Sequence, residues 1–180
     1  NAFCQDNDVS WTHWDLSPEA QEFLEFTRRL VALRRSEPVL TRRKYFQGRS
    51  IRGAEVKDIY WLDPSGREMT DEAWNAPFVR SLGVLMVGDA VDEIDERGRQ
   101  VTGDTLLILL NAHFEEVPFV LPKVDEGKSW LRAIDTIDAK ASETRFNGGA
   151  RYPLQGRTLA VFTLNSERRT RRTDDRLAAA

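Results

Sequence analysis

The chain has 180 residues, 41% of them hydrophobic and 31% charged, which is typical of a soluble globular protein with one good core or two small ones. The formal net charge of -3 argues against a nucleic-acid partner, because contacts with phosphates need a cationic surface. No apolar run approaches the roughly 18 residues that cross a bilayer, and residues 1–10 lack the pattern of a signal peptide, so no membrane partner is expected.

The N-terminal end gives two further expectations. The chain starts at Asn1 without an initiator methionine, and we therefore expect a piece of a longer protein. Cys4 is the single cysteine, which excludes an internal disulfide and fits a reducing compartment. The expected location is the cytoplasm.

The clearest predicted element is a helix from Pro18 to Arg35. Ser17 suits the N-cap and proline suits the first helical turn, whereas Pro38 ends the helix because it supplies no amide donor. Apolar residues recur at spacings of three and four: Phe23, Leu24, Phe26, Leu30, Val31 and Leu33. An apolar face of this breadth must pack against another surface.

After Pro38 the apolar period changes from 3.6 to 2, which indicates short strands between turns. The expected strands lie around Lys44 to Phe46, Asp58 to Leu62, Val79 to Val87, Thr105 to Asn111, Pro118 to Leu121, Ser129 to Ile134 and Leu159 to Leu164. Leu106 to Leu110 is apolar throughout, so we expect a central strand covered on both faces. The expected fold class is mainly β: an antiparallel β-sandwich preceded by one amphipathic α-helix.

Acidic residues are abundant, but no pair is placed for glycoside hydrolysis, which needs two carboxyl groups flanking the scissile bond. Asp92, Glu93, Asp95 and Glu96 lie beside Gly98, where a solvated hairpin tip is expected. Near the next acidic group, Glu68, Asp71 and Glu72, Thr70 is expected to cap a short turn. The sequence therefore predicts no catalytic residues.

The sequence also lacks a complete motif for a metal site or for a catalytic nucleophile. Asp6-Asn7-Asp8 resembles the start of a calcium loop, but the positions that need glycine and glutamate hold Trp11 and Ser17. One cysteine and two histidines offer no zinc-ligand spacing. Cys4 and His13 have no third residue to orient a nucleophilic pair, and no dinucleotide or phosphate loop occurs. We expect no metal and no cofactor.

The five tryptophans divide into two groups. Trp61 and Trp130 lie within strand patterns, which favours packing in the core. Trp11, Trp14 and Trp74 lie in predicted loops, where an indole ring can stack on a sugar ring. These three residues support an alternative function, an autonomous glucan-binding module.

Several phrases of the sequence resemble one family. Residues 1–11, Asn-Ala-Phe-Cys-Gln-Asp-Asn-Asp-Val-Ser-Trp, are similar to the segment after the eighth barrel strand in bacterial glycogen-debranching enzymes and isoamylases of the α-amylase superfamily. In that family the usual wording is Asn-Asn-Asn-Ala-Tyr-Cys-Gln-Asp-Asn-Glu, followed shortly by Trp. Phe3 replaces the tyrosine and Asp8 the glutamate, so a hydrogen bond from the tyrosine hydroxyl does not carry over.

The resemblance continues, in order, to about residue 165. The matching phrases are 30–40 (LVALRRSEPVL), 58–70 (DIYWLDPSGREMT) with Trp74, 80–84 (RSLGV), 109–113 (LLNAH) and 117–122 (VPFVLP). This resemblance implies a parent enzyme that hydrolyses α-1,6 branch linkages of glycogen or limit dextrin with retention of the anomeric configuration. The family's nucleophile, acid/base and stabilising residues precede the segment matched here, so the chain alone is expected to be inactive.

The resemblance also implies domains and partners. Residues 1–40 are expected to be the end of the catalytic barrel, 41–165 an accessory β-sandwich and 166–180 a disordered charged tail. The implied partners are the missing barrel and, for the parent, a branched α-glucan. Since barrel active sites are built from loops after strands, the expected glucan contacts are Asn1, Phe3, Gln5, Asp6 and Asn7. A third hypothesis is a self-contained hydrolase that uses Cys4 or the acidic loop at Asp92.

Overall fold

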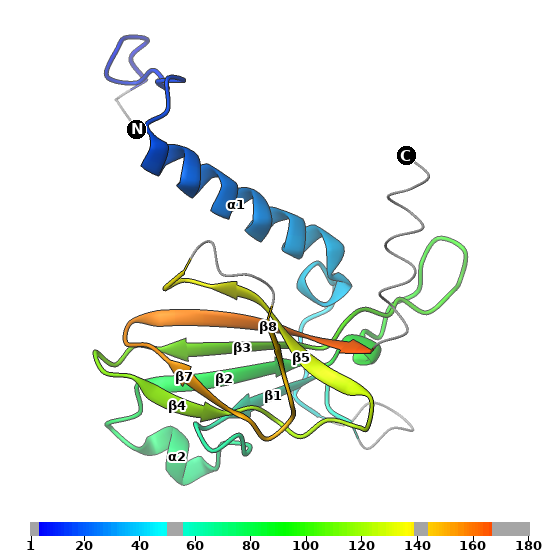
Figure 1. The fold of residues 1–180 in the computed structure, drawn as a ribbon. Helices are drawn as coiled ribbons and strands as arrows, with labels where there is room; N and C mark the ends of the chain where they lie inside the picture. Colours follow the sequence, from blue (N-terminus) through cyan, green and yellow to red (C-terminus); the bar gives the residue numbers. More distant parts are fainter. Residues whose placement is uncertain (1–3, 50–55, 139–143, 167–180) are drawn as a thin grey trace.

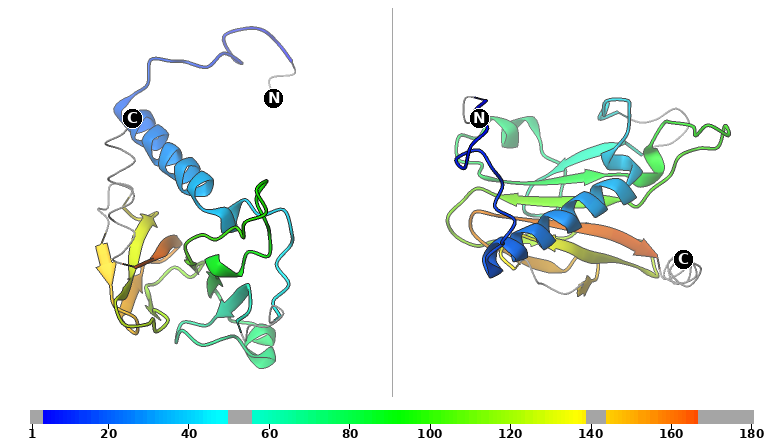
Figure 2. Two further views of the ribbon diagram at one scale, coloured as in Figure 1. Left: turned by 90° about the vertical axis from the view of Figure 1, so that its right-hand side faces the viewer. Right: turned by 90° about the horizontal axis from the view of Figure 1, so that it is seen from above.

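The computed structural model describes residues 4–49, 56–138 and 144–166 (Figure 1). Helix α1 (Pro18–Ser36) begins as the sequence predicts, because the Ser17 side chain accepts the amide of Ala20 at 3.2 Å. Figures 1 and 2 show α1 standing off the sheets, with its C-terminal end nearest to them. None of the 19 residues of α1, all of which the structure describes, is buried.

The strands form two antiparallel sheets, which confirms the expected mainly β sandwich. The strands are β1 (Ile59–Leu62), β2 (Ser81–Met86), β3 (Leu106–Asn111), β4 (Val117–Val120), β5 (Lys128–Asp135), β6 (Thr144–Phe146), β7 (Arg151–Leu154) and β8 (Thr158–Ser166). The large sheet has the order β1-β2-β3-β8-β5-β6, and the small sheet pairs β4 with β7. All the pairings among these described strands are antiparallel, as expected for a sandwich.

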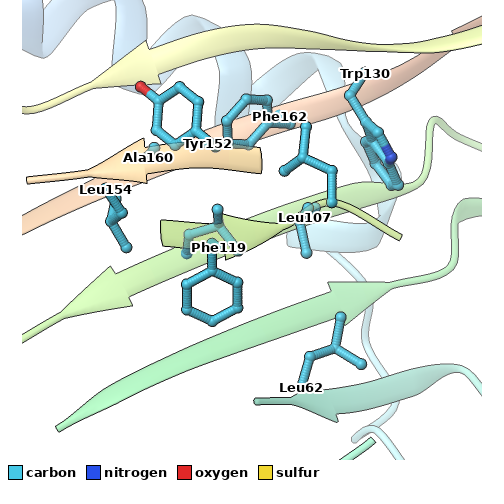
Figure 3. Close-up of a cluster of buried hydrophobic side chains, with 10 residues drawn as sticks. Leu62, Leu107, Phe119, Trp130, Tyr152, Leu154, Ala160 and Phe162 are labelled. Carbon is cyan, nitrogen blue, oxygen red and sulfur yellow. The ribbon is translucent and has the colours of Figure 1, made fainter. Parts of the chain in front are cut away.

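The main core lies between the two sheets (Figure 3). Its buried members are Leu62, Leu107, Leu109, Phe119, Leu121, Trp130, Tyr152, Leu154, Ala160 and Phe162. Packing is tight where β4 crosses β2: a Cβ added to Gly83 would lie 3.2 Å from the Phe119 ring. Alternate residues of β3 and β8 point into this core, as the period of 2 predicts.

A second, smaller cluster lies on the face of the large sheet that points away from β4 and β7, here called the outer face. It consists of Val39, Ile59, Met86, Val91 and Leu106. Val39 belongs to the short helix η1 (Pro38–Leu40), and Val91 directly follows the short helix η2 (Gly88–Ala90). Leu110 at the other end of β3 is 37% exposed, so the expected cover of this strand on both faces is incomplete.

Several elements differ from the expectation. Residues 44–46 are not a strand, and β6 and β7 were not predicted. β7 contains Pro153, and a proline argues against a strand because it has no amide to donate to the ladder. In the structure Pro153 lies opposite Pro118 of β4. Thr70 does cap a short helix, α2 (Asp71–Asn75), through its hydroxyl and the amide of Ala73.

The two tryptophans that were predicted to lie in the core differ in exposure. Trp130 is 1% exposed and its Nε1 donates to the Pro122 carbonyl at 2.9 Å, so this prediction is confirmed. Trp61 is 39% exposed, so the prediction is wrong there. β1 is an edge strand whose outer face is only partly covered at this position, and a strand pattern alone does not distinguish the two faces.

The expected tail, 166–180, lies outside the described residues except for Ser166, the last residue of β8. Within the described ranges, no helix is both long enough and apolar enough to span a membrane.

Candidate functional site

The expected glucan contacts lie on the segment before α1. Asn1 and Phe3 fall outside the described residues. Gln5, Asp6 and Asn7 lie together in a turn, where the Asn7 carbonyl accepts the amides of Ser10 and Trp11, each at 3.0 Å. This turn is preformed by local hydrogen bonds.

The side chains of this turn are partly engaged within it. Asp6 Oδ1 accepts the indole Nε1 of Trp11 at 2.6 Å, and Asn7 Oδ1 accepts the amide of Val9 at 3.1 Å. Gln5 and Asp6 are exposed and Asn7 is half-buried. Trp11 and Trp14 are 58% and 84% exposed, so polar groups and open indole rings lie on one short segment. Such groups have the chemistry to contact a sugar.

α1 presents an apolar surface to solvent. Phe23 is 69% exposed, Val31 44% and Leu30 38%, although their spacing is that of a packed helix face. A large exposed apolar patch with polar neighbours typically marks an interaction site. The described part of the chain leaves this face without a cover.

A second apolar surface lies at the edge of the sandwich. Trp61 of β1 and Trp74 of α2 contact each other edge to face, with ring centroids 5.7 Å apart and an interplanar angle of 73°. Trp74 is 49% exposed. α2 and α1 lie at opposite ends of the molecule in Figure 1 and in the left view of Figure 2. The tryptophan pair and the α1 face are therefore separate surfaces.

The buried carboxylates have structural partners. Asp58 forms an ion pair with Arg42, with Oδ2 3.1 Å from Nη1. Asp135 of β5 accepts the hydroxyl of Tyr152 of β7, and Arg132 lies 3.6 Å from the same carboxylate. Burial, and then the hydrogen bond to Asp135, raises the pKa of Tyr152 to about 12. This cluster joins the two sheets.

Several exposed acids have a lowered pKa, whereas a general acid needs a raised one. Hydrogen bonds from the Arg99 and Lys44 amides, respectively, lower the pKa of Asp95 and of Glu93. Asp95 also closes the turn at Gly98, as expected of a hairpin tip. The pKa is also lowered for Glu19, Glu72 and Asp125.

The next question is whether the described residues could bind a metal ion or supply a catalytic nucleophile. Among the described residues, no group of three or more histidine, cysteine or acidic side chains is arranged to hold a metal ion. Cys4 and His13 are both exposed. A hollow of about 390 Å³ lies beside the acidic hairpin, between Lys44 and Ile94, but Lys44 pairs with Asp92 and Glu93 accepts backbone amides there. These charges are already used within the fold.

Known proteins provide independent information. The glycogen operon protein GlgX homolog of Mycobacterium tuberculosis (strain ATCC 25618 / H37Rv) is 42% identical over 139 residues, which are 77% of this chain and 19% of that protein. The glycogen debranching enzyme of Dickeya chrysanthemi is 42% identical over 74 residues, 41% of this chain and 10% of that protein. The isoamylase of Pseudomonas amyloderamosa is 24% identical over 172 residues, which are 90% of this chain and 20% of that protein.

The chain thus spans about a fifth or less of the length of these curated relatives. The family described as isoamylase, C-terminal, matches residues 58–167, which include all eight strands. This match covers most of the chain and the whole sandwich. The chain therefore belongs to the isoamylase C-terminal family, as the phrases of its sequence indicated.

Proposed function

We propose that this chain is the non-catalytic C-terminal part of a glycogen-debranching glycoside hydrolase that cleaves α-1,6 branch linkages. The carrying observation is α1, a capped amphipathic helix with no buried residue. A helix gains most of its stability from burying its apolar face, so a surface of this kind calls for a partner. The partner we propose is the catalytic barrel of the same enzyme.

Two further observations support this role. The buried carboxylates Asp58 and Asp135 are paired within the sandwich, and hydrogen bonds lower the pKa of Asp95 and Glu93 in the acidic hairpin, which does not suit a general acid. The matched relatives are about five times longer than the part aligned with this chain. On this proposal residues 1–40 complete the barrel and 41–165 form the accessory sandwich. The cytoplasm is the proposed compartment, since a lone cysteine fits a reducing environment.

The test is complementation. The barrel of the parent enzyme and this chain are produced separately, mixed, and assayed for reducing ends released from limit dextrin. The chain alone is expected to release none, and the mixture to be more active than the barrel alone. Phe23→Asp should abolish this gain, because a charge would be buried at the interface.

A matched control lies on the same helix. Gln21 is exposed and lies about 200° around the helix from Phe23, so Gln21→Asp should leave complementation intact. Release of reducing ends by the purified chain alone, or full complementation by Phe23→Asp, would contradict the proposal.

The proposed glucan contacts remain Asn1, Phe3, Gln5, Asp6 and Asn7, near the rim of the barrel site. In the complemented enzyme, Gln5→Ala is expected to raise KM for limit dextrin several-fold with little change in kcat, because it removes a ground-state contact. An unchanged KM would remove Gln5 from the site.

The alternative, an autonomous glucan-binding module, is favoured by one observation: Trp11, Trp14 and Trp74 are each about half exposed or more. It predicts that the chain alone migrates more slowly in a native gel containing glycogen, and that Trp14→Ala and Trp74→Ala relieve the retardation. Equal migration with and without glycogen would eliminate this alternative.

A further inference from the structure

α1 is joined to the sandwich without a flexible linker. α1 ends at Ser36 and η1 begins at Pro38, so only Glu37 lies between them. The Glu37 amide donates to the Leu33 carbonyl at 3.2 Å, which continues the helix. The Glu37 side chain accepts the amide of Asp104 at 3.1 Å. One residue, 8% exposed, therefore holds both the helix end and the sandwich.

η1 is part of the sandwich rather than of α1. Val39 is 1% exposed and packs in the cluster on the outer face with Ile59 and Leu106. Pro38 lies directly on Gly103, where an added Cβ would be 2.8 Å from the proline Cδ. The first turn after α1 is thus fixed by close packing.

Asp58 then closes the following loop. Its carboxylate accepts Nη1 of Arg42 at 3.1 Å and the amides of Gln47 and Gly48, each at 3.0 Å. The Arg42 and Asp58 side chains are 6% and 3% exposed, and the guanidinium lies 4.2 Å from the centroid of the Phe46 ring. Removing one partner of a buried pair leaves the other charge uncompensated, so this arrangement has few alternatives.

A second carboxylate holds the middle of the same loop. Glu93 Oε1 accepts the amides of both Arg43 and Lys44, the latter at 3.0 Å, and Lys44 pairs with Asp92 at 2.8 Å. These groups are more exposed than Asp58, so their hydrogen bonds are weaker in water. Segment 37–48 is nevertheless tied to the sandwich along its whole length.

We infer that segment 37–48, held by Glu37, Asp58 and Glu93, is a rigid clasp that fixes the direction in which α1 leaves the sandwich. α1 has no buried residue, so its direction is set from its C-terminal end. A partner that packs on both α1 and the outer face meets two surfaces already arranged, which lowers the entropic cost of association. The inference concerns the chain itself and holds whether or not the partner is a catalytic barrel.

The test is the width of a distance distribution. In a Cys4→Ser background, spin labels are placed at Gln21→Cys on α1 and at Arg151→Cys on β7, both exposed positions. Double electron–electron resonance should give one narrow distribution for the otherwise unchanged chain. Asp58→Asn should broaden it at least twofold, because the neutral amide cannot hold Arg42 and both backbone amides.

Asp63→Asn is the matched control. The Asp63 carboxylate also accepts backbone amides in a turn, from Ser65 at 2.8 Å and Arg67 at 3.3 Å, but it does not touch the clasp. Its distribution should equal that of the unchanged chain. If Asp58→Asn unfolds the sandwich, seen as loss of amide dispersion in NMR spectra, Glu37→Ala is the deciding variant; the same broadening is expected because it removes the acceptor of the Asp104 amide.

Two results would contradict the inference that segment 37–48 fixes the direction of α1. One is a broad distribution in the unchanged chain, which would show that α1 swings freely. The other is a narrow distribution that persists in every folded variant of Asp58 and Glu37.

Discussion

The sandwich and α1 have equally regular apolar patterns but opposite packing. In β3, Leu106, Leu107 and Leu109 are completely buried, whereas α1 has Phe23 69% exposed and no buried residue. The patterns alone do not distinguish these outcomes, because periodicity gives the apolar face and not its cover. The sandwich is thus folded around its own core, whereas the apolar face of α1 has no cover within the described residues, as expected if it contacts the partner that we propose.

The largest expected difference between the two regions is the effect of truncating one phenylalanine in each. Phe119→Ala should destabilise the chain by about 3 to 5 kcal/mol, because it leaves a cavity between the sheets. Phe23→Ala should change the free energy of unfolding by less than about 0.5 kcal/mol, as for most exposed sites. Urea denaturation followed by tryptophan fluorescence measures both. Equal losses would show that α1 is packed in the isolated chain.

The second prediction concerns a buried amide that ties the sheets together at one end. Asn111 is 3% exposed; its Nδ2 donates to the carbonyls of Glu115, Leu154 and Gln155 at 2.9, 3.2 and 3.0 Å. Asn111→Ala should cost about 2 to 3 kcal/mol, because these carbonyls lose their donor in a buried site.

The control for that prediction is an exposed asparagine. Asn75 also donates to a carbonyl, that of Asp71, at 2.7 Å, but on the surface of α2. Asn75→Ala should cost less than about 0.5 kcal/mol, since water replaces the bond. A loss as large as that of Asn111→Ala would mean that α2 is integral to the core.

The third prediction is a pH dependence confined to the sandwich. The pKa of Tyr152 is raised from its usual 10 to about 12, so its stabilising contribution is complete below pH 10 and is lost as pH rises through 12. The loss is at most about 3 kcal/mol, at 1.36 kcal/mol per pKa unit. Urea denaturation at pH 9 and pH 12 should show a smaller loss for Tyr152→Phe than for the unchanged chain. Identical losses in the two chains would contradict the raised pKa.

Much of the fold follows from local chemistry. Ser17, Thr70 and the alternating strands give the helix starts and six of the strands, because caps and periods depend on neighbours in sequence. The sequence does not predict β7, because its proline pairs with another proline across the sheet, and this arrangement depends on the tertiary fold.

The candidate surfaces are harder to predict from sequence. The exposure of Trp61 depends on which face of an edge strand is covered, and the role of Asp58 depends on a loop that returns to it from residues 42–48. Nothing in the pattern around Asp58 marks it as a clasp residue. The resemblance of the phrases, by contrast, predicted the family match, since several motifs in fixed order are specific.

The last expected effect is small and is confined to α1. Ser17→Ala removes the N-cap hydrogen bond to Ala20 and should cost α1 about 0.5 to 1 kcal/mol of local stability. Amide exchange in the first turn of α1 should accelerate roughly two- to fivefold, whereas exchange in β3 and β8 should not change. This separation is expected because the first turn of α1 makes no buried contact with the sandwich, so its opening is local rather than global. Faster exchange in β3 as well would mean that helix and sandwich unfold as one unit, and the interface assigned to α1 would already be occupied within the chain.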